Sequence, residues 1–109
     1  MKQTFLIATH ARTDTGLMES ALDTILVALS FEQNVELLIL EQGTFSTLLN
    51  THEHIAKKFL QALQFGLKKI YSTQPVDFLV AQKPQTATTL LNKQQVIQIL
   101  ANTKNVIDY

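Results

Sequence analysis

Short apolar runs alternate with longer amphipathic stretches along this chain of 109 residues, and this alternation restricts its fold more than any other feature. The run Phe5–Ala8 is apolar without interruption, which is typical of a strand buried on both faces. Between Gly16 and Ser30 the apolar residues instead recur every three or four positions, which indicates one face of a helix. Strands that alternate with helices in this way predict a mostly parallel sheet with helices on both faces.

The same two patterns predict the remaining elements. Further strands are expected at Val35–Leu40, Lys69–Ser72, Thr86–Leu91 and Val106–Ile107, and further helices at Thr44–Leu49 (one short turn), from near Thr51, at Val76–Gln82 and after Asn92. The pairs Asn50–Glu53 and Asn92–Gln95 have the spacing of a capping box, and Gly66 suits the position just beyond a helix. The predicted fold is a single three-layer α/β/α domain over residues 1–109, with a mostly parallel five-stranded sheet.

The charge balance excludes one class of partner. Nine basic residues offset nine acidic ones, and Arg12 is the single arginine. Proteins that bind nucleic acid draw much of their affinity from a basic excess that neutralises phosphates, so no direct nucleic-acid contact is expected. The hydrophobic fraction of 46% argues against a disordered chain.

The sequence contains no cysteine, which removes disulfides, thiolate metal sites and a cysteine nucleophile. No stretch approaches the about 18 apolar residues of a membrane span, so no membrane partner is expected. The first apolar run gives way to polar residues from Thr9 onward, which is too early for the apolar region of a signal peptide. The cytoplasm is therefore the expected location.

Parallel α/β sheets bind ligands beyond the carboxyl ends of their strands. The loop after the first strand reads THARTDTG, without the G-x-G-x-x-G of dinucleotide sites or the G-x-x-x-x-G-K-[ST] of triphosphate sites. The hydroxyls of Thr9 and Thr15, together with Arg12, could hold a small anion where the helix starts at Gly16. We favour the alternative of a plain connecting loop, because most loops only connect.

Other chemistry finds little support in the sequence. His52 and His54 lie two positions apart, and in a helix such side chains point about 200° away from each other, so a shared metal ion is not expected. His10 has no identifiable partner and is interpreted as an ordinary loop residue. There is no G-x-S-x-G nucleophile elbow, and the paired acidic residues of a phosphoacceptor receiver domain are missing. We predict no catalytic residue, no cofactor and no metal site.

The chain carries more large apolar residues than one thin layer of helices needs. This surplus comprises Phe45, Leu48, Leu49, Phe65, Tyr71, Phe78 and Leu79. Because a chain with zero net charge is poorly protected against association, a hydrophobic subunit interface is one interpretation. The other, given equal weight, is that all of these side chains reach the core.

Three segments follow the order of a known family. They are Phe5–Leu26, with the strand FLIAT and the helix start TGLMESALDTIL; Val35–Leu49, with the strand VELLIL and then EQGTFSTLL; and Ile99–Tyr109, ILANTKNVIDY. In these segments the chain resembles the DsrE/DsrF family, and most closely its TusC (DsrF-like) branch. The similarity is strongest over residues 1–66, and Ser72–Leu91 match only in outline.

The resemblance implies a place in a sulfur relay. That family forms heterohexamers in which a DsrE/TusD-like subunit carries a cysteine persulfide and passes sulfur to a TusE/DsrC-like acceptor. The relay serves 2-thiouridine formation at the tRNA wobble position in the Tus branch, and sulfur oxidation in the Dsr branch. A chain without cysteine cannot hold a persulfide, which fits a non-catalytic TusC-like subunit beside DsrE/TusD-like and DsrH/TusB-like partners.

The resemblance also suggests where such partners would bind. The segment Glu41–Leu49 and the helix that begins near Thr51 are the expected contacts. The candidate interface residues are Phe45, Leu48, Leu49 and Phe59. Three alternatives stay open: a homo-oligomeric DsrE-like binding protein with an anion at Thr9–Gly16, the DsrF subunit of sulfur oxidation, and a small enzyme of another class.

Overall fold

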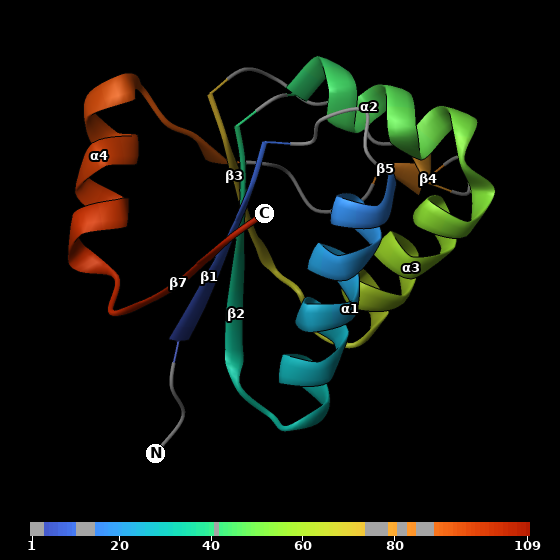
Figure 1. Ribbon diagram of the computed structural model, residues 1–109, viewed down its shortest axis with the longest axis horizontal. Helices are drawn as coiled ribbons and strands as arrows, with labels where there is room; N and C mark the ends of the chain where they lie inside the picture. Colours follow the sequence, from blue (N-terminus) through green and yellow to red (C-terminus); the bar gives the residue numbers. More distant parts are fainter. Residues whose placement is uncertain (1–3, 11–14, 41, 74–78, 81–82, 85–88) are drawn as a thin grey trace.

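Five parallel strands form the central sheet of the computed structural model, in the order β6-β3-β2-β1-β7 (Figure 1). Their bounds are β1 Thr4–Thr9, β2 Asn34–Ile39, β3 Lys69–Ser72, β6 Thr89–Leu90 and β7 Asn105–Asp108. The structure describes residues 4–10, 15–40, 42–73, 79–80, 83–84 and 89–109, of which 42–46, 79–80 and 83–84 are described by their backbone alone. The prediction of a single α/β domain with a five-stranded parallel sheet is confirmed.

Helices cover the two faces of the sheet unequally. The four helices of the described residues are α1 Thr15–Ser30, α2 Gln42–Thr51, α3 Glu53–Gln64 and α4 Lys93–Asn102. Figure 1 shows α1 and α3 together on one face, α4 alone on the opposite face, and α2 across the end at which the strands finish. None of these helices is both long and apolar enough to cross a lipid bilayer.

The core is divided in the same unequal way. The larger cluster lies between the sheet and the pair α1 and α3, where Leu22, Ile25 and Phe59 are completely buried. The smaller cluster, under α4, has three buried members, Leu6, Ala8 and Leu38. Every residue of α4 is described and none is buried, so this helix covers its face of the sheet only thinly.

The segment around Leu79 differs from the prediction of a short helix over 76–82. Its described part is a two-stranded antiparallel ribbon, β4 (Leu79–Val80) paired with β5 (Lys83–Pro84). Pro84 disfavours the helical region for Lys83, which fits the extended backbone found there. The segment predicted as a single turn at 44–49 is instead part of the longer helix α2.

The two predicted capping boxes have different outcomes. At α4 both reciprocal bonds are present, because the Gln95 amide donates to Asn92 Oδ1 and the Asn92 amide donates to Gln95 Oε1, each at 2.8 Å. The box at Asn50 is wrong, because α2 continues to Thr51 and keeps Asn50 helical. The N-cap of α3 is therefore His52, which makes no side-chain capping bond. Gly66 follows α3 with a φ of 118°, as its residue type predicts.

Replacing Asn92 by alanine should lower the free energy of unfolding by about 1 kcal/mol, because the amide of Gln95 loses its acceptor. Asn50→Ala is the matched control and should change stability little, since Asn50 does not cap a helix. Urea unfolding followed by circular dichroism measures both changes. Equal losses in the two variants would contradict the assignment of the cap.

Candidate functional site

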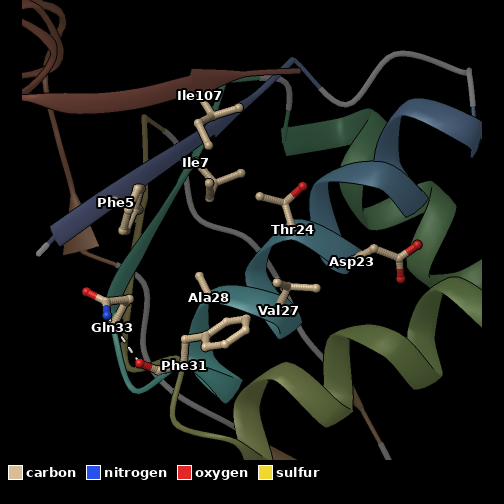
Figure 2. Close-up of a pocket in the computed structure, with 9 residues that line it drawn as sticks. All are labelled: Phe5, Ile7, Asp23, Thr24, Val27, Ala28, Phe31, Gln33 and Ile107. Atoms are coloured by element: carbon tan, nitrogen blue, oxygen red, sulfur yellow. Dashed lines mark hydrogen bonds between the residues drawn. The ribbon is translucent and has the colours of Figure 1, made fainter.

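A cavity of about 670 Å³ opens between α1 and the side of the sheet formed by β1 and β7 (Figure 2). Its size falls within the roughly 300–1,000 Å³ that is typical of ligand pockets. Most of its lining is apolar. The lining residues are Phe5, Ile7, Asp23, Thr24, Val27, Ala28, Phe31, Gln33 and Ile107.

The cavity follows from the order of the strands. Ile7 of β1 and Ile107 of β7 are partners in register, so their side chains lie on the same face of the sheet. On that face α1 packs over β1 and β2, whereas α4 lies on the opposite face (Figure 1). Figure 2 shows Ile107, Ile7 and Phe5 on the floor and the side chains of α1 on the facing wall.

The outer rim of the cavity is an exposed apolar pair at the end of α1. Val27 is 56% exposed and Phe31, four residues later, is 71% exposed. The chain turns directly after Phe31, where Glu32 takes a left-handed conformation with a φ of 59°. The Glu32 amide donates to Leu29 O and the Gln33 amide to Ala28 O, which is the bonding pattern of a Schellman motif. These bonds fix the backbone on either side of Phe31.

Two polar side chains of the lining, Asp23 and Thr24, contact Lys58 of α3 and Tyr109. Asp23 Oδ1 accepts a bond of 2.7 Å from Lys58 Nζ, and Thr24 Oγ1 contacts the Tyr109 hydroxyl. Lys58 also lies 3.2 Å from Glu19 Oε1. The bond to Asp23 is the main cause of the raised pKa of Lys58. Lys58 therefore connects α3 to α1.

The third polar group, Gln33, donates from Nε2 to the Phe31 carbonyl at 3.2 Å (Figure 2). These three polar side chains, the ones that the described residues contribute to the lining, thus have partners within the chain. A mostly apolar hollow of this size suits the burial of apolar surface, either of a ligand or of another protein.

The loop predicted to bind an anion is described in part. Thr9 is buried at the end of β1, Thr15 is half-buried and Gly16 is exposed at the start of α1, while Arg12 lies outside the described residues. The anion site therefore stays a prediction. His10, interpreted as a loop residue without a partner, has Nε2 at 3.2 Å from Asp108 Oδ1. Sequence reasoning missed this pair because His10 follows β1 and Asp108 lies on β7, almost the whole chain apart.

The two histidines near α3 lie closer than the helical geometry predicted. His52 is the extended N-cap, so the angle between helical positions does not apply, and its ring centroid is 5.9 Å from that of His54. His54 Nε2 is 3.1 Å from Glu19 Oε2. Among the described residues no group of three or more His, Asp or Glu side chains is placed to hold a metal ion.

The candidate interface residues occupy different environments. Leu48 and Phe59 are buried in the chain's own core and Leu49 is half-buried, while the side chain of Phe45 lies outside the described residues. Subunit contact at α2 and α3 stays a prediction, and it would have to use the outer side chains of these helices. Phe65 is exposed, as the interpretation of surplus apolar residues allowed.

The exposed apolar residues at the end of α1, Val27 and Phe31, were not singled out from the sequence. Val27 and Phe31 are four positions apart and lie beside the buried stripe of α1, so helical spacing carried a signal for them. No signal in the sequence could place Phe5 or Ile107 opposite them, because that depends on the order of strands.

No protein-family model matches the chain, and no curated protein matches its sequence. Of the features that the resemblance implies, the structure confirms only the class of fold, a small α/β domain with a five-stranded parallel sheet.

Tyr71 forms a half-buried polar contact on the side of the sheet that α4 covers. Its hydroxyl donates to Glu36 Oε1 at 3.2 Å, and its ring packs against the smaller core cluster. Burial is the main cause of the raised pKa of Tyr71, and the nearby Glu36 carboxylate adds to it.

Replacing Phe59 by alanine should lower the free energy of unfolding by about 3–5 kcal/mol, because it empties a completely buried site. Phe31→Ala should change it by no more than about 0.5 kcal/mol, since that ring is mostly exposed. Urea unfolding of both variants tests the assignment. A large loss in Phe31→Ala would show that this ring belongs to the core.

Tyr71 also gives the protein a dependence on alkaline pH. Because its folded pKa lies above the ordinary value of 10.0, the folded state keeps a proton that the unfolded state has released, and stability falls as the pH rises from about 10 through the folded pKa. Tyr71→Phe should make this decline shallower. Unfolding measured at a series of alkaline pH values tests it, and identical slopes for the two proteins would contradict the prediction.

Proposed function

We propose that the chain is a non-catalytic, TusC/DsrF-like subunit of a heteromeric sulfurtransferase. Its expected partners are DsrE/TusD-like and DsrH/TusB-like subunits, and a TusE/DsrC-like protein would accept the sulfur from the assembly. The fold, a small parallel α/β domain, is compatible with the proposal, and the proposal starts from the resemblance to that family, which is strongest over residues 1–66.

The observation that carries the proposal is the apolar cavity with its exposed rim. Phe31 and Val27 present apolar surface to solvent beside a hollow whose polar groups already have partners. Exposed apolar surface that is concentrated at one place is characteristic of a contact with another protein. We place the contact with a partner subunit at this rim.

In the proposed relay, the cysteine that carries the persulfide belongs to the partner subunit. A persulfide is held on a cysteine thiolate, and this chain has no cysteine. The proposed role is therefore to supply buried surface that holds the cysteine-bearing subunit in place. Formation of 2-thiouridine at the tRNA wobble position is the proposed outcome, and sulfur oxidation is the alternative within the same family.

Co-expression with the DsrE-like and DsrH-like chains of the same organism tests the proposal. The three chains should elute together from a sizing column at moderate salt. Phe31→Glu should remove this chain from the particle, because it places a charge at the apolar rim. Ile97→Glu is the control, since Ile97 of α4 is also exposed (58%) but does not line the cavity.

Circular dichroism of the free Phe31→Glu variant checks that it folds. Where the three chains elute together, the 2-thiouridine content of tRNA in cells that lack this chain separates the two branches of the family. Separate elution of the unmodified chains would overturn the proposal. An equal effect of Phe31→Glu and Ile97→Glu would show that the contact is not at the cavity rim.

A further inference from the structure

The strand β7 is one edge of the sheet. It pairs with β1 on its inner side, and within the described residues no strand pairs with its outer side. The edge is accessible, because Val106 at its centre is 37% exposed and the side chains of Lys104 and Asp108 are also exposed. Unpaired edges of this kind readily accept a further strand.

The direction of the backbone groups along β7 follows from two hydrogen bonds. The Tyr109 amide donates to Ala8 O at 2.8 Å, and the Tyr109 carbonyl accepts from the His10 amide at 3.1 Å, so both groups of Tyr109 point toward β1. Backbone groups of successive strand residues point alternately to the two sides. The amides and carbonyls of Lys104, Val106 and Asp108 therefore point to the outer edge.

We propose that two copies of this chain pair through β7 as antiparallel strands about a two-fold axis at Val106. The two five-stranded sheets then become one continuous sheet. Val106 lies opposite Val106 of the second copy, and each donates its amide to the carbonyl of the other. This is the pattern of a hydrogen-bonded antiparallel pair, and it needs no change in either strand.

Charge complementarity selects this register. With the axis at Val106, Lys104 lies opposite Asp108 of the second copy, and the symmetry makes this pair twice. All these side chains lie on the face that α4 covers, because alternate residues of a strand share a face. Directly opposed opposite charges stabilise antiparallel strands, and like charges destabilise them.

The neighbouring registers lack this pairing. Moving the axis to Ile107 places Val106 opposite Asp108, and moving it to Asn105 places Lys104 opposite Val106. In a two-fold contact, a residue that meets a second residue of the other copy is itself repeated by the symmetry, so both partners must be present on the same segment of chain. Lys104, directly before β7, and Asp108 of β7 meet this requirement. A net charge of zero adds no overall repulsion between copies.

The proposed strand pairing uses a surface separate from the cavity rim, and it needs no other subunit. It is therefore tested by measuring the mass of the purified chain, without any partner subunit, by sedimentation equilibrium. The unmodified chain should form a dimer. Lys104→Asp should raise the dimer dissociation constant by roughly tenfold, because it turns two opposite-charge pairs into two like-charge pairs. Asp108→Lys should act in the same direction.

The charge-swapped double variant, Lys104→Asp with Asp108→Lys, is the decisive measurement, because it restores opposite charges across the axis and should restore the dimer. Val106→Pro gives a second test: the amide that it removes points away from β1, so the monomer keeps its ladder to β1 while the dimer loses both central bonds. Circular dichroism confirms that each variant folds.

A monomeric unmodified chain would overturn the inference, and so would a dimer that both single charge variants leave unchanged. If the double variant does not recover the dimer, the proposed register, in which Lys104 lies opposite Asp108 of the second copy, is wrong. Phe31→Glu should leave this dimer intact, which separates the outcome from that of the co-expression experiment.

Discussion

The last crossover of the chain determines where the molecule is covered and where it is open. The strands β6 and β7 are parallel and lie at opposite edges of the sheet, so the connection between them must cross one whole face. The helix α4 makes that crossing on the face opposite α1 and α3 (Figure 1). It buries none of its own residues completely, and no helix of the described residues lies over β7 on the other face. The cavity beside Ile107 is the direct result.

Local patterns in the sequence are sufficient for most of the elements. The buried strands β1 and β2 and the stripe of α1 follow from apolar periodicity alone, and Asn92 caps α4 as its spacing predicts. The same spacing fails at Asn50, because the preceding helix continues past it. Neighbouring structure therefore decides whether a capping motif forms, and the spacing by itself does not.

The candidate site required information that local patterns do not contain. Phe59 and Phe31 are both aromatic and both belong to amphipathic segments, yet one is completely buried and the other mostly exposed. What separates them is the position of the helix edge relative to the sheet. Phe5 and Ile107 lie together because β7 is placed beside β1, and no short-range signal specifies that neighbour.

The pairing of β1 with β7 also governs how the protein can fold as it is made. Ile7 is synthesised before its partner Ile107, and all the other described elements of the sheet and its helices lie between β1 and β7 in the sequence. Until then the side of β1 that will meet β7 has no strand beside it, although β1 carries the buried residues Leu6 and Ala8. Until β7 has been made, a nascent chain exposes this unpaired edge of β1, and unpaired strand edges of this kind make partly folded chains prone to aggregation.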